Sequence, residues 1–178
     1  MGALSGIRVL DLSRVLAGPW CGQILADLGA EVIKVERPRV GDDTRGWGPP
    51  YMKTPEGENS AEASYYQSAN RNKLSVSINI ATPEGQELVR ALAATADVLI
   101  ENYKAGSLAK YGLDYESLSE LNPRLVYCSI TGFGQTGPET QRPAFDQVVQ
   151  AMGGGMSITG TPDTGPIRSG IPIGDLGG

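Results

Sequence analysis

The sequence predicts an α/β fold with a doubly wound, mainly parallel sheet. Short apolar runs alternate with amphipathic stretches, which is the pattern of strands joined by crossover helices. The first 36 residues read as strand, helix and strand, the βαβ unit that joins parallel strands. The chain has 178 residues, 40% of them hydrophobic and 20% charged, so it is long enough for a domain with a packed core. We expect right-handed crossovers on both faces of the sheet.

The βαβ unit opens the chain. The apolar run in residues 6–13, "GIRVLDLS", predicts a buried strand. A helix is expected within 14–30, where Pro19 suits a first helical turn and Gly29 suits a C-terminal end. Residues 31–36, "EVIKVE", alternate as a second strand.

A polar stretch rich in proline and glycine, residues 37–72, separates this unit from the next strand. We expect a long irregular excursion there, of the functional or disordered kind. Strand character resumes at 73–80, "KLSVSINI". A helix is predicted over 82–96, with Thr82 as its N-cap and Pro83 at its first position.

Further strands are expected at 97–102 and 124–132, with a short helix at 115–122 between them. The segment "GFGQTG", residues 132–137, matches the dinucleotide-binding pattern G-x-G-x-x-G directly after the last of these strands. That site needs a helix to open at the glycines, but prolines interrupt the next residues. A glycine-rich turn is therefore favoured over a nicotinamide site.

Composition and charge exclude several classes of function. We expect no nucleic-acid partner, because the net charge is −5 and the 15 basic residues form no continuous stripe. We expect no membrane partner, because no apolar run approaches the roughly 20 residues that a spanning helix needs. The first ten residues lack the pattern of a secretory signal, and Cys21 and Cys128 have no CxxC spacing. A cytoplasmic protein with two buried, reduced thiols is predicted.

The sequence contains no histidine. A Ser-His-Asp triad, a histidine base and the usual zinc sites are therefore excluded, and no metal is expected. Any acid, base or nucleophile must be a carboxylate, lysine, tyrosine, cysteine or activated hydroxyl.

Polar and basic residues follow several of the predicted strands. In open α/β sheets ligands bind at these carboxyl ends, and a cluster of cations would suit a ligand with more than one phosphate. The residues in question are Ser13, Arg14, Glu36, Arg37, Arg39, Arg45, Asn70 to Lys73, Asn102, Tyr103, Lys104 and Lys110.

Seven stretches together closely resemble the family III CoA-transferases: "LDLSRVLAGPW", "LGAEVIKVERP", "GDDTRGWGPP", "NRNKLSVSIN", "TPEGQELV", "ADVLIENYKAGSLAKYGLDYESLSELNPRLVYCSITGFGQTGP" and "GIPIGDLGG". The resemblance implies that residues 1–178 are the N-terminal, CoA-binding part of a Rossmann-like large domain. In that family the small domain and the last segments of the large domain lie downstream, members are about twice this length, and they form interlocked homodimers.

The resemblance also implies the reaction, which is transfer of CoA from an acyl-CoA donor to a carboxylic acid. The CoA thioester is a substrate, and no prosthetic group is implied. The stretches "GDDTRGWGPP" and "NRNK" look most like members that handle dicarboxylates such as succinate and glutarate, so succinyl-CoA is the expected donor.

By its position in "GIPIGDLGG", Asp175 matches the nucleophilic aspartate of the family. Its carboxylate would attack the thioester and form an aspartyl mixed anhydride. The glycines beside it would allow close approach of substrate and leave free amides for the oxyanion. The local sequence alone leaves a second interpretation open, in which Asp175 caps a helix.

Carried over position by position, the resemblance implies contacts with CoA at four regions. The first is the turn after the first strand, and the second is the set of residues around the adenine and phosphate end of CoA. The third is the loop after the fourth strand, and the fourth is the segment along the pantetheine. The implied residues are Val15, Leu16, Ala17, Arg37, Ile78, Asn79, Ala81, Asn102, Tyr103, Lys104, Lys110, Arg142, Phe145 and Asp146. Some family members carry a lysine where this chain has Ala81, so Arg45 or Lys73 is expected to substitute for it.

Two alternatives remain. α-Methylacyl-CoA racemases are similar in sequence but need a His-Asp pair, and this chain has Phe145 in place of the histidine. A non-catalytic CoA-binding protein is the other alternative, and the presence of Asp175 argues against it.

Overall fold

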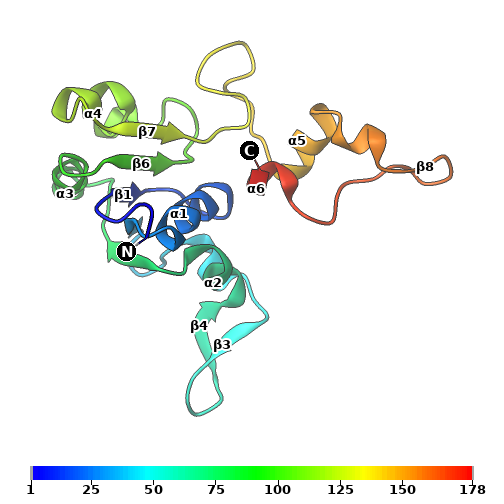
Figure 1. The fold of residues 1–178 in the computed structure, drawn as a ribbon, viewed down its shortest axis with the longest axis horizontal. Coiled ribbons are helices and arrows are strands. Elements are labelled where there is room, and N and C mark those ends of the chain that lie inside the picture. The colour runs from blue at the N-terminus through cyan, green and yellow to red at the C-terminus, as the bar shows by residue number, and fades with distance from the viewer. Residues whose placement is uncertain (1, 178) are drawn as a thin grey trace.

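The computed structural model describes residues 2–177 and is built on a five-stranded parallel sheet (Figure 1). The strand order is β5-β2-β1-β6-β7. The bounds are β1 Arg8–Asp11, β2 Glu31–Glu36, β5 Lys73–Ser77, β6 Val98–Glu101 and β7 Val126–Ser129. The five predicted strands and their parallel pairing are confirmed.

Helices cover both faces of the sheet, as a doubly wound fold requires. They are α1 Ala17–Asp27, α2 Ser64–Asn70, α3 Pro83–Ala93 and α4 Tyr115–Leu121. One apolar cluster joins Leu10 and Leu99 of the sheet to Val89 of α3, and a second joins Val9 to Ala26 of α1. Because neighbouring residues of a strand point to opposite faces, these clusters lie on the two sides of the sheet. The predicted α/β, Rossmann-like fold is confirmed.

The caps of α3 follow the sequence signals. The Thr82 hydroxyl accepts a hydrogen bond from the Gly85 N–H at 3.2 Å, and Pro83 is the first helical residue. The segment 132–137 forms turns without a helix, so the prediction of a glycine-rich turn is confirmed.

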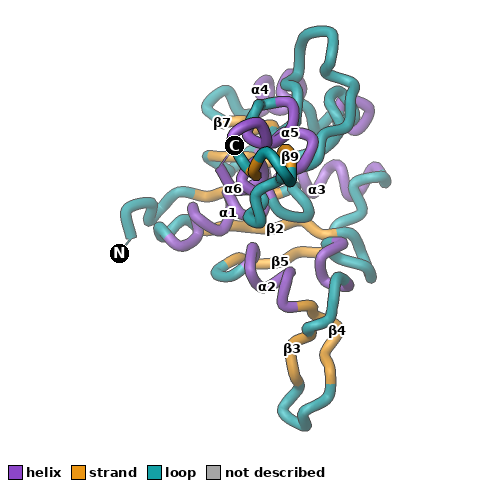
Figure 2. Tube along the Cα trace, turned by 90° about the vertical axis from the view of Figure 1, so that its right-hand side faces the viewer, coloured by secondary structure: helices purple, strands orange, loops and turns teal. Residues whose placement is uncertain are grey.

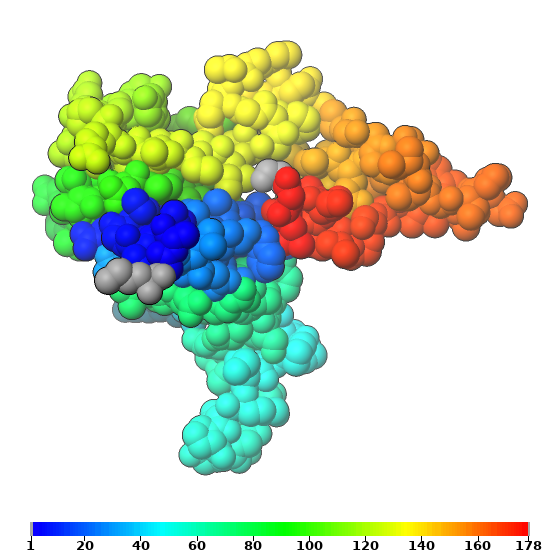
Figure 3. Space-filling model, in the orientation of Figure 1, coloured from blue at the N-terminus to red at the C-terminus, as the bar shows by residue number. Residues whose placement is uncertain are grey.

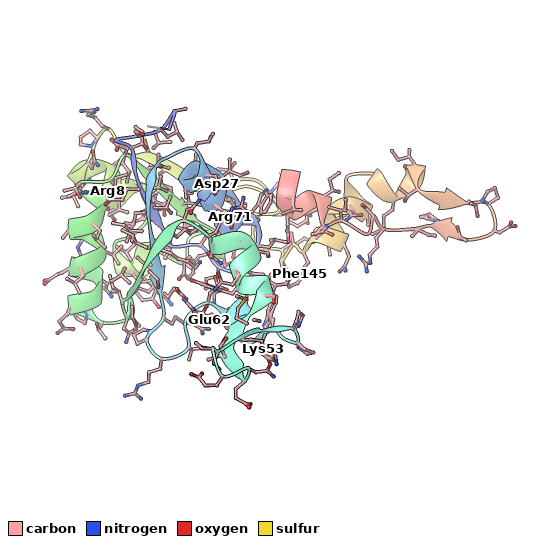
Figure 4. All side chains as sticks on the ribbon, turned by 60° about the horizontal axis from the view of Figure 1, so that its bottom comes forward. Arg8, Asp27, Lys53, Glu62, Arg71 and Phe145 are labelled. Carbon is pink, nitrogen blue, oxygen red and sulfur yellow. The ribbon has the colours of Figure 1, made fainter. Side chains whose placement is uncertain are left out.

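The prediction of an irregular excursion at residues 37–72 is wrong. This part contains a short 3₁₀ helix, a hairpin that projects from the body of the molecule, and α2 (Figure 2). The 3₁₀ helix η1 spans Asp43–Gly46, and the hairpin strands are β3 Tyr51–Lys53 and β4 Asn59–Ala63. The two helices α1 and α2 lie in contact. At the start of β5, Arg71 pairs with Asp27 of α1 (Figure 4).

The last part of the described chain forms a second projection, which we call the arm, residues 146–177 (Figure 1). It contains α5 Asp146–Met152, the 3₁₀ helix η3 Gly155–Ile158, the strands β8 Gly160–Thr161 and β9 Gly165–Pro166, and α6 Ile173–Gly177. A further 3₁₀ helix, η2 Ala109–Tyr111, precedes α4. Helix α6 turns back to contact both α5 and α1, so the end of the arm lies against the body (Figure 3).

The two cysteines are half-buried rather than buried, which corrects the prediction. Both pack against the cluster that joins the sheet to α1. Within residues 2–177, no helix is both long enough and apolar enough to cross a bilayer.

Candidate functional site

The strand order places a crevice at the carboxyl ends of β1 and β6. The chain runs outward from β1 toward β5 in one direction and from β6 toward β7 in the other, so the connections diverge between β1 and β6. Ligands of open α/β sheets bind where the connections diverge in this way. The loops beyond the two strands are tied together there, because Asn102 accepts from the Arg14 N–H at 2.8 Å and donates to the Arg14 carbonyl at 2.7 Å.

A hollow of about 660 Å³ opens beside this crevice. One side is formed by the start of α1 and the loop after β6, and the other by the loop after β7 and the arm. Seven of the residues expected at the site line it together: Ala17, Asn102, Tyr103, Lys104, Arg142, Phe145 and Asp175. Figure 4 shows Phe145 where the body meets the arm.

Asp175 is half-buried in α6 and lines the hollow. Burial raises the pKa of its carboxyl, and the negative charge of Asp146 raises that pKa further. Asp146 lies in the first turn of α5 and accepts the Gly174 N–H at 2.9 Å. It therefore holds the residue next to Asp175 rather than lining the hollow itself.

The interpretation of Asp175 as a helix N-cap is wrong. Helix α6 begins at Ile173, so Asp175 lies inside its first turn. The Asp175 N–H bonds to the Pro172 carbonyl at 3.2 Å. The expectation that the glycine amides are free is also wrong for Gly174, because Asp146 occupies that amide.

One aromatic residue of the excursion lies close enough to Asp175 to respond to its charge. Burial raises the pKa of Tyr65 in α2, and the negative charge of Asp175 raises that pKa further. Tyr65 packs edge-to-face on Trp47, with 5.6 Å between ring centres. The aspartate therefore has a protonated phenol nearby, and Trp47 packs on the ring that carries it.

Cationic and aromatic side chains meet on the sheet side of the crevice. The Arg14 guanidinium lies 5.2 Å from the ring centre of Tyr103. Asp43 pairs with Arg14 at 3.4 Å and with Arg37 at 2.5 Å. Burial raises the pKa of Tyr103, although both arginines oppose the shift, so its phenol remains a hydrogen-bond donor.

The remaining expected contacts lie outside the hollow: Val15, Leu16, Arg37, Ile78, Asn79, Ala81 and Lys110. Ile78 is 6% exposed and packs in the core, and its N–H bonds to the Glu36 carbonyl at 3.0 Å, so neither its side chain nor its N–H is free to meet a ligand. Asn79 and Ala81 are exposed beyond the carboxyl end of β5, where Asn79 accepts the Ala81 N–H at 3.1 Å. The Lys110 ammonium lies over the Tyr111 ring, 4.7 Å from its centre.

Neither of the two cations expected to substitute for a lysine at position 81 is free. Arg45 donates to Glu36 and Glu62, and Lys73 is paired with Asp11 at 2.9 Å with only 2% of its side chain exposed. Among the residues that the structure describes, no acidic side chain pairs with Lys104, which does line the hollow.

Sequence reasoning missed several residues of the hollow, notably Ile130, Thr131, Gln141 and Val149. Thr131 is the most informative, because its hydroxyl is buried without a hydrogen-bond partner anywhere in residues 2–177. It follows the carboxyl end of β7, so the rule that ligands bind at these ends could have found it.

The sequence comparisons agree on one family. The model of CoA-transferase family III matches residues 4–178. The chain is 60% identical over 173 residues to the succinate–glutarate CoA-transferase of Agrobacterium fabrum, a match that covers 97% of this chain and 43% of that protein. It is 51% identical over 176 residues to the succinyl-CoA:glutarate CoA-transferase of Mus musculus, covering 99% of this chain and 39% of that protein. The chain spans about two fifths of the length of the curated relatives it matches.

Solved structures give the same result. A CAIB/BAIF family protein from Brucella suis superposes with a TM-score of 0.92 at 55% identity, over 98% of this chain and 45% of that one. The D175A mutant of Rv3272 from Mycobacterium tuberculosis superposes with a TM-score of 0.84 at 36% identity, also over 98% of this chain and 45% of that one. The family that the seven stretches indicate is confirmed.

Proposed function

The chain belongs to CoA-transferase family III, and from this premise we propose that it is the N-terminal, CoA-binding part of the large domain of an acyl-CoA:carboxylate CoA-transferase. The observation that carries the proposal is the position of Asp175, a half-buried carboxylate that shares one hollow with Lys104 and Arg142. The family match and the names of the relatives support the same reaction.

The first half of the reaction transfers CoA to the enzyme by way of an acyl-enzyme anhydride. A carboxylate oxygen of Asp175 attacks the thioester carbonyl carbon, the carbon–sulfur bond breaks, and CoA leaves as a thiolate. The product is a mixed anhydride between Asp175 and the acyl group. The thiolate then attacks the aspartyl carbonyl of this anhydride, which releases the donor acid as a carboxylate and leaves CoA as a thioester of Asp175.

The second half runs the same steps in reverse with the acceptor acid. Its carboxylate attacks the aspartyl thioester and expels the CoA thiolate, and a second mixed anhydride forms. The thiolate attacks the acceptor's acyl carbon, which regenerates the Asp175 carboxylate. Charge and atoms balance without a metal or an external base.

Burial of Asp175 suits this role. A carboxylate that has lost part of its hydration is a stronger nucleophile, and the raised pKa of Asp175 reports that loss. The Thr131 hydroxyl has no hydrogen-bond partner in the described part of the chain and is available to donate to a ligand oxygen. Lys104 and Arg142 supply positive charge in the same space.

The proposed substrates are succinyl-CoA and a small dicarboxylic acid. The relatives from Agrobacterium fabrum and Mus musculus carry succinate and glutarate in their names. A dicarboxylate presents a second anionic group after its first has reacted, and the cations of the hollow match that charge.

A homodimer in the cytoplasm completes the proposal. Large apolar side chains on and beside the arm are exposed, with Ile158 at 88%, Phe145 at 70% and Ile171 at 63%. Exposed apolar surface of this kind is typical of a protein–protein interface, which supports a homodimer. Light scattering of the full-length protein tests the homodimer, and cell fractionation tests the cytoplasmic location.

Replacement of Asp175 tests the mechanism. In the full-length protein, Asp175→Asn is expected to lower kcat by at least about 1,000-fold, because the amide is not a nucleophile. Hydroxylamine is expected to trap an adduct on the peptide "GIPIGDLGG" after incubation with succinyl-CoA. Exchange at the wild-type rate by the variant, or an adduct that maps elsewhere, contradicts the proposal.

A further inference from the structure

Val15 has a backbone conformation that its side chain disfavours. Its φ is +70°, in the left-handed region, where a β-branched residue is rare. It lies in the turn between β1 and α1, which we call the entry turn, residues 13–16. The turn leads directly to Ala17, the residue of α1 that lines the hollow. A strained residue persists only where its surroundings hold it.

A buried ion pair lies under the entry turn. The Lys34 ammonium is 2.9 Å from the Asp42 carboxylate, and their side chains are 1% and 0% exposed. Lys34 also donates to the Ser13 carbonyl at 2.9 Å. Asp42 accepts the Val15 N–H with both carboxylate oxygens, at 3.4 and 3.3 Å. The pair therefore contacts the turn on each side of Arg14.

Three other polar backbone groups of the turn are held by side chains. Asp11 accepts the Ser13 N–H at 2.9 Å. Asn102 binds both the N–H and the carbonyl of Arg14. Lys34 and Asp42 hold two further groups, because within residues 2–177 no other hydrogen bond is made by the Ser13 carbonyl or the Val15 N–H.

Stability alone does not account for a lysine in the centre of the sheet. Lys34 lies on β2 between Asp11 of β1 and Ser75 of β5, directly after the apolar pairs Val9–Val32 and Leu10–Ile33. Lysine is almost never fully buried, and a buried ion pair gives little or no advantage over apolar residues of the same volume. The benefit of the pair must therefore lie in the geometry that it imposes.

We propose that Lys34 and Asp42 are positioning residues that hold Val15 in its left-handed conformation and so shape the entry turn for acyl-CoA. The inference rests on the proposed function, because it assigns the turn to the CoA thioester. Neither residue lines the hollow, so both act through the backbone of the turn.

The test is a neutral pair, Lys34→Met with Asp42→Asn, in the full-length protein. This double variant removes both charges together. The Asn oxygen keeps the acceptor that Thr44 uses at 2.8 Å, whereas the carboxylate oxygen that lies 3.3 Å from the Val15 nitrogen becomes an NH₂ group, which cannot accept from it. KM for succinyl-CoA is expected to rise about tenfold, which corresponds to about 1.4 kcal/mol. Because the proposal assigns the turn to the CoA thioester and not to the acceptor acid, KM for that acid and kcat are expected to stay within about twofold.

Two controls separate positioning from general loss of stability. Val89→Ala weakens the core beneath α3, on the other face of the sheet, and is expected to lower Tm without raising KM. Adding Val15→Gly to the double variant is expected to bring the rise in KM from about tenfold to about threefold, since glycine adopts a positive φ without steric cost. A purely structural role predicts no such rescue.

A second readout does not depend on catalysis. Hydrogen exchange of the Val15 amide is expected to be faster in the double variant than in the wild type, and unchanged in Val89→Ala. If the double variant fails to fold, Asp42→Glu keeps the charge but moves the carboxylate, and the same rise in KM and in exchange is expected. An unchanged KM with a protected Val15 amide overturns the inference. A wild type that binds CoA but transfers none contradicts the proposed function instead, and the exchange result still decides the role of the pair.

Discussion

Two carboxylates of the arm decide the chemistry at the scale of single residues. Asp175 lines the hollow, and Asp146 raises its pKa while holding the Gly174 amide. Asp146 thus combines two effects on the nucleophile, an electrostatic one and a geometric one. They can be separated, because asparagine keeps the oxygen that accepts the amide but lacks the charge.

Asp146→Asn is expected to move the acid limb of the pH profile of kcat/KM to lower pH. Asp175 must be ionised to attack, so activity falls as the pH drops through its pKa, and removal of the neighbouring charge lowers that pKa. The plateau at higher pH is expected to change by less than about threefold. Asp163→Asn, an exposed carboxylate on the same arm, serves as the control. An acid limb that does not move in Asp146→Asn contradicts the coupling.

At the scale of elements, one carboxylate organises the excursion between β2 and β5. Glu36, at the end of β2, is 6% exposed and accepts five hydrogen bonds. The donors belong to the loop between β2 and η1, to η1 itself, to α2 and to β5. Burial alone would raise the pKa of Glu36, but the donors, Arg45 first among them, lower it to about 2. The excursion is ordered because its polar groups converge on this carboxylate.

Acid unfolding tests this organisation. The pKa of Glu36 is lower in the folded state than its ordinary value of 4.5, so its stabilisation is present above pH 4.5 and is lost as the pH falls toward 2. The loss is on the order of 3 kcal/mol. Glu36→Gln is expected to lower Tm at neutral pH and to flatten this part of the pH dependence. The exposed Glu87→Gln is the control, and equal profiles for the two variants contradict the prediction.

How much of these elements the sequence predicts depends on the range of the contacts that form them. Local signals placed α3, because Thr82 and Pro83 act within one turn. They missed the ordered structure of the excursion, because Glu36 bonds to Tyr66 at a separation of 30 residues and to Ser75 at a separation of 39. For the same reason Lys73 read as a free cation, although it pairs with Asp11 at a separation of 62.

The residues of the candidate site also divide into those that the sequence predicts and those that depend on contacts between distant segments. Asn102 to Lys104 follow a strand and were predictable from the rule for parallel sheets. The position of Asp175 beside Tyr65 was not, because it depends on how the arm folds back onto the body.

At the scale of the whole molecule, the hollow has two sides that come from different structural units. The body supplies Asn102, Tyr103 and Lys104, whereas the arm supplies Asp175. The packing of α6 on α5 fixes the position of Asp175 relative to the side of the hollow that the body forms. It depends on Gly174, where an added Cβ would lie 3.2 Å from both Asp146 and Val149.

Gly174→Val is expected to displace α6 from α5 and to lower kcat at least about tenfold, because a small displacement of a nucleophile costs a large part of its effect. KM for succinyl-CoA is expected to stay within about twofold, since the body side is untouched. Gly170→Val is the matched control, because apart from its two chain neighbours no atom of residues 2–177 lies within 4 Å of the Cβ position there. Equal kcat values for the two variants would show that the arm does not set the position of Asp175.

The order β5-β2-β1-β6-β7 has a consequence for biosynthesis. The Arg8 N–H at the start of β1 bonds to Asp97, 89 positions later, and β1 then pairs along its length with β6. Of the five strands of this sheet, β1 leaves the ribosome first, yet it becomes the middle strand, and one of its sides stays unpaired until β6 has emerged. Pairing between strands that are distant in sequence slows folding. The growing chain is therefore most prone to aggregation, and most dependent on chaperones, while the residues between α1 and β6 are being synthesised.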